Sequence, residues 1–325
     1  MRIIVTGGAG YIGSAAAAAL LEAGHEVSVF DSLVTGHRRA LPDGATFIQG
    51  DLADVGALND ALAAGSFEAV MHFAAFIEAG ESMRDPGRFY RNNLTNSLQL
   101  IEAAQRAGVR RFVLSSTAAV YRSSDEALTE ESALGPTNVY GHTKLTIEQA
   151  LDWYREIHGM RFAALRYFNA CGATPGRGEA HRPESHLIPR VLKVALGQEP
   201  AAQVYGTDYP TPDGTCIRDY VHVSDLVAAH LLALTALEKE SRLVYNIGSG
   251  TGYSVREVIE AARSVTGHPI PMNEAARRPG DPPRLVASSE KIRHMLGWRP
   301  AYNSLAQMIA SAWDWHRSMP NGYED

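Results

Sequence analysis

The sequence is poor in cysteine, and its two cysteines, Cys171 and Cys216, lie too far apart to match any metal-ligand spacing. We therefore do not expect a domain cross-linked by disulfide bonds or a cysteine-based zinc site, and no metal site is predicted. We interpret both cysteines as reduced packing residues in a cytoplasmic protein. The first apolar strand begins at the second residue, which is unlike a signal peptide.

Basic residues are in the minority, since 30 lysines and arginines stand against 36 aspartates and glutamates, and the formal net charge is −6. This balance gives no basic surface for nucleic acid. Apolar runs stay shorter than the roughly 18 residues that a membrane-spanning helix requires. With 45% hydrophobic residues in a chain of 325, the composition is that of a globular protein with a substantial core. We therefore expect neither nucleic acid nor a membrane as a partner.

Short apolar strands alternate with helical stretches through the first half of the chain. RIIVTGGAGYIGSAAAAALLEAGHEVSVFDS is typical of a strand, a glycine turn, a helix and a second strand. Further strands are predicted in ATFIQGD, EAVMHFAA, RRFVLSS and RFAALRY, with helices at about 52–64, 87–107 and 138–158. Repeated units of this kind predict an α/β fold with a Rossmann-type, doubly wound parallel sheet and helices on both faces.

The composition of the sequence and the length of its predicted elements change after about residue 170. A long loop rich in glycine, proline and charge, CGATPGRGEAHRPESH, precedes shorter elements. We predict a dinucleotide-binding domain over residues 1–170 and a smaller C-terminal α/β substrate-binding region over 171–325, with segments near 217–250 returning to the first domain. Ser254 and Glu257 have the spacing of a capping box, and Ser185 is expected to cap the helix that follows it.

Three glycines, Gly7, Gly10 and Gly13, follow the first predicted strand and open the first predicted helix. Backbone N–H groups and a helix N-terminus, which carries roughly +0.5 charge, suit a pyrophosphate. Asp31 ends the second strand about 20 residues onward, where a carboxylate can bind a ribose 2′-hydroxyl. A 2′-phosphate would meet a like charge, so the sequence favours NAD over NADP. The arginines at 38–39 could reverse this preference, or they could form a solvated loop face.

Tyr140 and Lys144 lie four residues apart in a predicted helix, and therefore on one face of it. Upstream, the strand RRFVLSS runs into three hydroxyls, Ser115, Ser116 and Thr117. A positive charge about 5 Å from a phenol contributes roughly 3.3 kcal/mol at an effective dielectric of about 20, enough to lower a tyrosine pKa from about 10 to about 8. We expect Lys144 and an oxidised nicotinamide to act in this way, so that Tyr140 removes a proton from a substrate hydroxyl.

The motifs TGGAGYIG, SSTAAVY and YGHTK resemble the extended short-chain dehydrogenase/reductase superfamily. Within it, LGPTNVYGHTKLTIE, LRYFNACGA, VYGTDYPTPDGTCIRDYVHVSDL, YNIGSGTGYSV and RRPGDPP resemble the UDP-glucose 4-epimerase family. The likeness covers nearly the whole chain, and DYPTPDGTCIRDYVHV is its most specific part. It implies an isomerase that oxidises C4 of a UDP-sugar with NAD, lets the 4-keto sugar turn, and returns the hydride to its other face.

The same resemblance assigns roles to the hydroxyl cluster. Thr117 is implied to hydrogen-bond the sugar C4 oxygen beside the base Tyr140. Related dehydratases and decarboxylases place an acid directly after this hydroxyl, whereas Ala118 and Ala119 stand here, which implies epimerisation alone. The implied cofactor-binding residues are Gly7, Gly10, Tyr11, Ile12, Gly13, Asp31, Asp51, Leu52, Phe73, Ala74, Ala75, Asn92, Ser115, Tyr140, Lys144 and Phe168.

Substrate contacts are expected mainly from the second half of the chain. Arg218 and Arg278 suit a diphosphate, because a guanidinium fork matches phosphate oxygens. By resemblance, Asp281 contacts the nucleotide, Asn169 meets the phosphate–sugar end and Tyr205 lies near uracil; read singly, each could be an ordinary salt bridge or core residue. The implied substrate-binding residues are Thr117, Asn169, His186, Leu187, Tyr205, Arg218, Tyr220, Arg278, Asp281 and Leu285.

Four positions depart from the family pattern, and one of them, Arg122, replaces the usual glycine after VY without an explanation from the sequence. Ile77 stands where many members have a lysine that reaches the cofactor, which puts tight retention of NAD in doubt. His186 replaces a frequent asparagine near the diphosphate, and a substrate contact, capping and solvent exposure all stay open. Leu285 is smaller than the tyrosine that can stand beside the sugar C2 substituent. This difference motivates the hypothesis that UDP-N-acetylhexosamines are also accepted.

Two other functions remain as alternatives. A 4-epimerase of another UDP-sugar, a pentose or a uronate, would share the same motifs. A non-catalytic NAD-binding regulator would not need the intact set of Thr117, Tyr140 and Lys144.

Family members commonly form homodimers through two helices of each subunit, which match 87–107 and 138–158 here. Leu94, Leu98 and Ile101 could serve that surface or the core.

Overall fold

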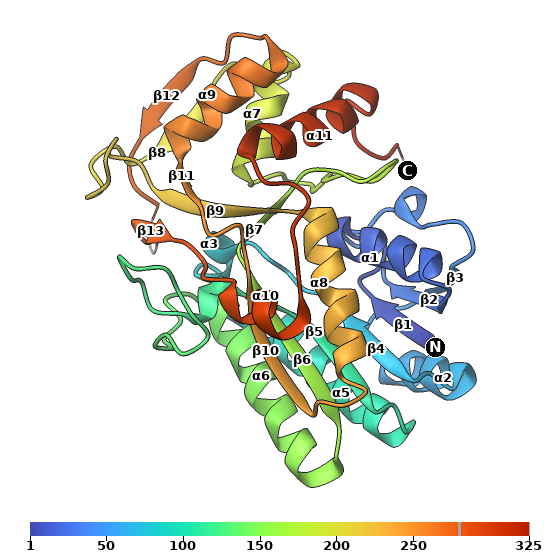
Figure 1. Cartoon of the computed structure of the whole chain (residues 1–325). Coiled ribbons are helices and arrows are strands. Elements are labelled where there is room, and N and C mark those ends of the chain that lie inside the picture. Colours follow the sequence, from blue (N-terminus) through green and yellow to red (C-terminus); the bar gives the residue numbers. More distant parts are fainter. Residues whose placement is uncertain (279–280, 325) are drawn as a thin grey trace.

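The computed structural model describes residues 1–278 and 281–324, and its central feature is a seven-stranded sheet (Figure 1). Its strands are β1 (Arg2–Thr6), β2 (Glu26–Asp31), β3 (Thr46–Gln49), β4 (Ala69–His72), β5 (Arg111–Thr117), β6 (Arg161–Tyr167) and β10 (Arg242–Ile247). They lie in the order β10-β6-β5-β4-β1-β2-β3, and neighbouring strands pair in parallel. The predicted Rossmann-type, doubly wound parallel sheet is therefore confirmed.

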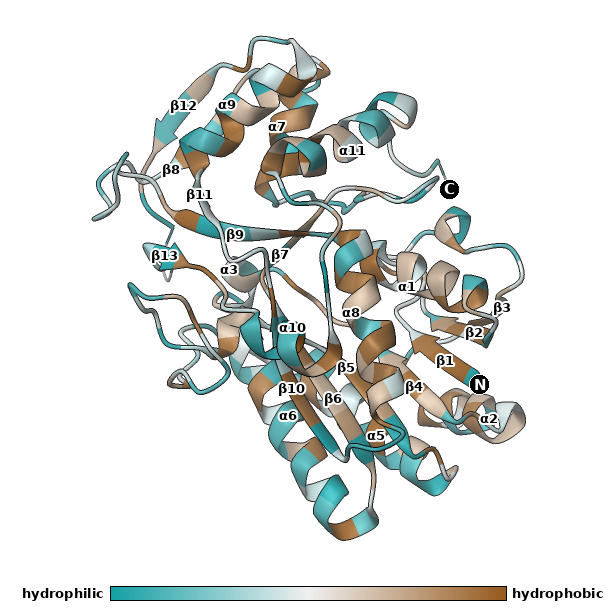
Figure 2. Cartoon of the chain, viewed as in Figure 1, coloured by the Kyte–Doolittle hydropathy of each residue, from teal (hydrophilic) through white to brown (hydrophobic). Residues whose placement is uncertain are grey.

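Helices cover both faces of this sheet. They are α1 (Tyr11–Glu22) and α8 (Val223–Ala236) on one face, and α2 (Val55–Gly65), α5 (Asn96–Arg106) and α6 (Val139–His158) on the other. Successive strand residues point to opposite faces, so Ile3 and Val5 pack with α1 and α8, whereas Ile4 packs with α2, α5 and α6. Burial on both faces explains why β1 is brown along most of its length in Figure 2.

The alanine-rich helix α1 lies close to the sheet and to α8 because its inward side chains are small. Ala15, Ala16 and Ala17 are all buried. The helix ends at Glu22, and Gly24 follows with a φ of +80°, a left-handed conformation that favours glycine.

The helix predicted over 87–107 is confirmed as one continuous helical run from Pro86 to Arg106, with a π-helical turn inside it. The segment contains α4 (Pro86–Phe89), a π-helical turn η2 (Tyr90–Thr95) and then α5. Within η2 the side chain of Asn93 is tied to the backbone of Phe76, since its Oδ1 accepts from the Phe76 N–H at 2.8 Å and its Nδ2 donates to the Phe76 carbonyl at 2.8 Å. This tertiary contact favours the wider turn, which a sequence pattern does not show. Turns of this kind are frequent at functional sites.

The second half of the chain builds a smaller layer above the carboxyl ends of the central strands (Figure 1). The strands β7 (Asn169–Cys171), β9 (Ile217–His222), β11 (Gly252–Ser254) and β13 (Arg284–Leu285) form one sheet, and β8 (Ala202–Tyr205) pairs with β12 (Met272–Ala275). The helices α7 (Leu187–Ala195), α9 (Val255–Thr266) and α11 (Leu305–Ser318) pack together around a core cluster of their own. The remaining elements are η1 (Arg38–Ala40), α3 (Ala79–Ser82), η3 (Ala118–Val120) and α10 (Glu290–Leu296).

Two cap predictions have different outcomes. The capping box of Ser254 and Glu257 is confirmed at the start of α9. The prediction that Ser185 caps α7 is wrong, because the N-cap is His186, whose backbone N–H donates to the Glu184 carboxylate at 2.8 Å. Within the described ranges 1–278 and 281–324, no helix is long and apolar enough to cross a membrane.

Candidate active site

A cavity of about 340 Å³ lies at the carboxyl ends of the central strands. Its walls include Gly7 after β1, Asp31 at the end of β2, Phe73 after β4, Thr117 at the end of β5 and Tyr167 at the end of β6. The crevice between β1 and β4, where the winding of the sheet reverses, is where sheets of this type bind ligands. The cavity is therefore the candidate active site.

Every residue that the resemblance assigns to the cofactor lines this one cavity. The set comprises Gly7, Gly10, Tyr11, Ile12, Gly13, Asp31, Asp51, Leu52, Phe73, Ala74, Ala75, Asn92, Ser115, Tyr140, Lys144 and Phe168. Ile77, the position of the missing lysine, also lines it. These residues come from segments spread over more than 150 positions of the chain, and the fold brings them together.

The glycine turn forms a cradle that side chains would fill. A Cβ atom on Gly13 would lie 2.2 Å from the Gly7 carbonyl oxygen, and one on Gly7, at φ +73°, would lie 2.4 Å from the Ala74 nitrogen. Gly10 is the N-cap of α1 and offers no capping side chain, so the N–H groups of the first turn are open to an anion. The turn thus fits the pyrophosphate of a dinucleotide.

Asp31 is held in place by the backbone. Its Oδ2 accepts the Ala9 N–H at 2.9 Å and its Oδ1 accepts the Leu33 N–H at 2.8 Å. Burial raises the pKa of Asp31, while these two donors lower it. Arg38 stacks on Phe47 with its guanidinium carbon 4.8 Å from the ring centre, and among the described residues the cavity walls include neither Arg38 nor Arg39. Since neither arginine lines the cavity, neither is placed to favour a 2′-phosphate, and the preference for NAD over NADP stands.

Tyr140 enters the cavity from the first turn of α6. Asn138 caps this helix by accepting the Gly141 N–H at 2.8 Å. A Cβ atom at Gly141 would lie 2.2 Å from the Ala119 carbonyl oxygen, so glycine allows α6 to approach the segment that follows Thr117. Burial raises the pKa of Tyr140 to about 12, the hydrogen bond with Thr117 lowers it, and the charge of Glu78 raises it.

Lys144 is fully buried, and its Nζ donates to the Ser115 carbonyl at 2.8 Å. Burial lowers the pKa of Lys144 to about 8, while the Glu148 carboxylate one turn further along α6 raises it. The expectation of a Tyr140 pKa near the working pH applies to the chain with NAD bound and stays a prediction; without cofactor the pKa lies higher. Burial of the phenol dominates, and sequence spacing does not show burial.

A buried ion pair supports this part of α6. Arg166 of β6 donates through Nη2 to Glu148 Oε2 at 2.6 Å and through Nε to both carboxylate oxygens, while Ser116 donates to Oε1. Arg166 Nη1 also donates to the Tyr121 hydroxyl at 2.9 Å, and that hydroxyl donates to Asn246 Oδ1 at 2.7 Å. The network joins α6, β5, β6 and β10 directly beneath Lys144.

The predicted substrate residues divide into two groups. Thr117, Asn169 and His186 line the cavity. The others lie outside its walls, namely Leu187, Tyr205, Arg218, Tyr220, Arg278, Asp281 and Leu285.

Several of these outer residues are neighbours. Arg278 places its guanidinium carbon 3.9 Å from the ring centre of Tyr205, and Arg218 Nη2 lies 3.6 Å from Asp281 Oδ1. Leu285 of β13 is in register with Arg218 of β9. By contrast, Tyr220 and Leu187 pack with the core of the smaller layer.

The structure adds wall residues that the sequence analysis did not name. Tyr167 pairs its hydroxyl with the Ser115 hydroxyl, and Glu78 accepts the Ile77 N–H at 3.1 Å. The loop between β7 and α7 contributes Glu179 and His181. The density of charge in that loop and the place of Tyr167 in the motif LRYFNACGA were the available signals, whereas Glu78 stands in no quoted motif.

The chain matches the NAD dependent epimerase/dehydratase family over residues 3–248. The UDP-glucose 4-epimerase of Halalkalibacterium halodurans is 50% identical to it, over 99% of this chain and 98% of that protein. A crystal structure of a UDP-glucose 4-epimerase superposes with a TM-score of 0.97 at 50% identity, covering 100% of both chains. The UDP-glucose 4-epimerase of Bifidobacterium longum, solved in complex with NAD+ and UDP, is 37% identical with a TM-score of 0.95, over 99% of this chain and 100% of that one. This chain thus belongs to the NAD dependent epimerase/dehydratase family and, within it, groups with the UDP-glucose 4-epimerases.

Proposed function

We propose that the protein interconverts UDP-galactose and UDP-glucose with NAD as its cofactor, and is therefore an isomerase. The observation that carries this proposal is the convergence of Thr117, Tyr140 and the glycine turn on one cavity. Full-length similarity to UDP-glucose 4-epimerases supports the sugar nucleotide. Ala118 and Ala119 follow the hydroxyl, as expected for an enzyme that only oxidises and re-reduces C4.

NAD, when bound, supplies the acceptor and later the donor of the C4 hydride. Thr117 orients the C4 oxygen, and Tyr140 removes its proton and later gives it back. With a pKa of about 12, the phenol holds its proton in the chain without cofactor. One positive charge about 5 Å away is worth roughly 3.3 kcal/mol, which lowers that pKa only to about 10. Tyr140 accepts the C4–OH proton only as a phenolate, so we infer that the Lys144 ammonium and the oxidised nicotinamide together lower its pKa further before this proton leaves with the hydride.

We propose that the outer group of residues holds UDP while the hexose turns. Arg278 and Tyr205 form a cation–π pair, and a hydrogen bond with Arg278 lowers the pKa of Tyr205, to which the positive charge of Arg278 also contributes. The side chain of Arg218 is partly buried, and its Nη2 lies 3.6 Å from Asp281 Oδ1. If the diphosphate is anchored and the sugar is held weakly, the 4-keto sugar can turn and be reduced on its other face. The alternative of a different UDP-sugar is less favoured, because the curated relatives at 44–50% identity are UDP-glucose 4-epimerases. A non-catalytic regulator is not favoured, because these relatives are enzymes.

The oligomeric state and the location also belong to the proposal. We propose a homodimer, supported by two large apolar side chains of α6, Trp153 and Ile157, which are 67% and 68% exposed and lie one turn apart. Ile101 is fully buried in the core, so it does not serve such a surface. Sedimentation equilibrium of the wild type and of Trp153→Glu tests the dimer. A cytoplasmic location fits two unpaired, buried cysteines.

The first test is to incubate the purified protein with UDP-galactose, without added NAD, and to follow UDP-glucose. Conversion is expected, and conversion only after NAD is added would point to weak retention at Ile77. Tyr140→Phe should lower the rate by about 10²–10⁴-fold with an unchanged circular dichroism spectrum. A full rate in Tyr140→Phe, or no conversion of UDP-galactose with or without NAD, would contradict the proposal.

A further inference from the structure

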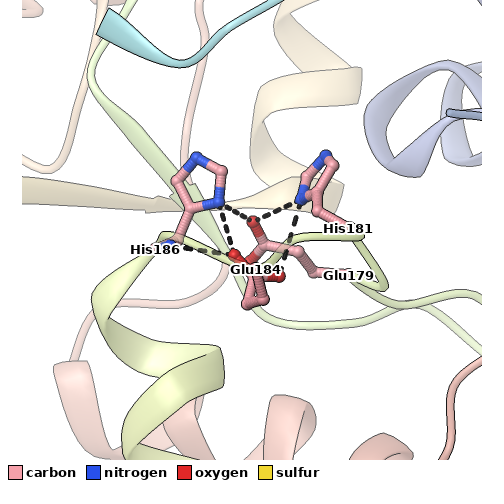
Figure 3. Close-up of side chains that lie close together, drawn as sticks. All are labelled: Glu179, His181, Glu184 and His186. Carbon is pink, nitrogen blue, oxygen red and sulfur yellow. Dashed lines mark hydrogen bonds and ion pairs between the residues drawn. The ribbon is translucent and has the colours of Figure 1, made fainter. Parts of the chain in front are cut away.

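Four chemically reactive side chains meet on the loop between β7 and α7. Glu179, His181, Glu184 and His186, here called the His–Glu cluster, each bring one nitrogen or oxygen atom within 4.8 Å of the others. In Figure 3 both imidazole rings turn a nitrogen toward the two carboxylates that lie between them. The residues span only eight positions of the chain, from the loop into the N-cap of α7.

Two of the four distances between these atoms are close to those around a single metal ion, and the two at His186 are shorter. His186 Nδ1 lies 2.9 Å from Glu179 Oε1 and 2.8 Å from Glu184 Oε1. His181 Nδ1 lies 3.2 Å from Glu179 Oε1 and 3.6 Å from Glu184 Oε2. Nitrogen and oxygen ligands at about 2.0–2.2 Å from a tetrahedral zinc ion stand roughly 3.3–3.5 Å apart. Small rotations of the side chains would complete such a shell.

Hydrogen bonds do not satisfy the cluster. Glu184 has a side chain that is 2% exposed, and its Oε2 has no hydrogen-bond partner among the described residues. His181 Nδ1, which is buried and faces the same point, also has none in that part of the chain. The single Nδ1 of His186 faces two carboxylate oxygens, although one N–H cannot point well at both. Buried polar atoms left in this way are rare and need an explanation.

We propose that the His–Glu cluster binds one divalent transition-metal ion of the zinc type. Two imidazoles and two carboxylates form a mixed nitrogen and oxygen ligand set, which suits zinc, whereas magnesium and calcium prefer oxygen ligands alone. The two carboxylates balance the charge of the ion. They also outweigh the roughly +0.5 charge of the α7 N-terminus beside His186.

The competing explanation is an ion-pair network of two protonated histidines with two glutamates. It needs no metal, and among the described residues it leaves Glu184 Oε2 with an ion-pair contact of 3.6 Å to His181 Nδ1 and no hydrogen bond of good geometry. A bound ion would use all four side chains at once and would cross-link the loop to the start of α7. Glu179, His181 and His186 line the active-site cavity, so the ion would fix the position of that wall. This inference goes beyond the proposed function, and its test does not depend on sugar turnover.

The test is a titration of the EDTA-treated, dialysed full-length protein with Co²⁺, followed by displacement with Zn²⁺. We expect one equivalent per chain and the strong visible absorption of four-coordinate cobalt, which zinc abolishes. Glu184→Gln, which keeps the shape of the side chain, and His181→Ala should each weaken binding by at least about 100-fold, as expected for loss of a ligand. Circular dichroism checks that each variant folds.

A matched control is Glu290→Gln with His294→Ala, which alters an exposed His–Glu pair of α10 whose charged atoms lie 3.4 Å apart. It should bind cobalt as the wild type does. Weak, multiple or octahedral binding that neither cluster variant reduces would mean adventitious surface binding and would overturn the proposal. No binding by the wild type would overturn it as well, in favour of the ion-pair network. If a variant does not fold, the cobalt spectrum of the wild type alone decides whether the His–Glu cluster binds a metal ion.

Discussion

Replacing Glu148 by glutamine should strongly destabilise the protein. Glu148 and Arg166 are each 4% exposed, and their charged atoms lie 2.6 Å apart. In Glu148→Gln the guanidinium stays buried without its counter-charge, and removal of one partner of a buried ion pair costs about 3–5 kcal/mol. That is a large part of the roughly 5–15 kcal/mol by which a domain is stable. The pKa of Lys144 should fall further, because the Glu148 charge raises it.

The assay is urea unfolding at neutral pH of the wild type, of each single variant and of the double variant Glu148→Gln/Arg166→Met. The double variant removes both charges and should regain part of the lost free energy of unfolding. Glu102→Gln is the matched control, because Glu102 pairs with Arg106 at 2.7 Å on the exposed surface of α5. Such a pair contributes only about 0.3–0.5 kcal/mol.

Two results would refute this reasoning. A loss in Glu148→Gln no larger than in Glu102→Gln would show that the buried network contributes no net stability. A double variant no more stable than Glu148→Gln would show that the unpaired Arg166 charge is not the cause.

Three further predictions address protonation, acid stability and specificity. Glu78→Gln removes a charge that raises the pKa of Tyr140, so the acid limb of the kcat/KM profile should move to lower pH; an unmoved limb would rule this out. Burial lowers the pKa of His230 from 6.5 to about 4. Between these two pH values the folded state binds fewer protons than the unfolded state. The free energy of unfolding therefore falls as the pH drops through this range, by up to about 3 kcal/mol. His230→Gln should flatten this loss in urea unfolding at several pH values, and an equal slope would contradict the assignment. The wild type should turn over UDP-N-acetylgalactosamine and Leu285→Tyr should not, with UDP-galactose turnover kept in both. Undetectable wild-type turnover of the N-acetyl sugar would sink the hypothesis.

Local patterns predicted the central sheet well, because each strand and helix carries its own hydrophobic period. The glycine turn directly follows the first strand, and Asp31 ends the second. Because these strands are parallel, their carboxyl ends lie at the same edge of the sheet, so the turn and Asp31 were expected to meet there. The π-helical turn inside the helix over 87–107 could not be predicted, because it accompanies the contact between Asn93 and Phe76, which lie 17 residues apart.

The candidate site was predicted where residues are local in sequence, as with Tyr140 and Lys144 on one helix face. Glu78 was missed, because it reaches the cavity from a segment without a motif, and Tyr167 was missed although it lies in the motif LRYFNACGA. The sequence shows which charges lie near Tyr140, but the burial that raises the pKa of its phenol in the chain without cofactor depends on the whole fold.

The central claim is that one C4 hydrogen leaves the sugar and returns to its other face. The direct measurement is to convert UDP-galactose carrying deuterium at C4 in ordinary water and to determine the isotope at C4 of the UDP-glucose formed. The account predicts that the deuterium stays at C4 through complete epimerisation. Hydrogen from the solvent at that position would contradict it, because epimerisation would then proceed by proton exchange and not by oxidation and re-reduction.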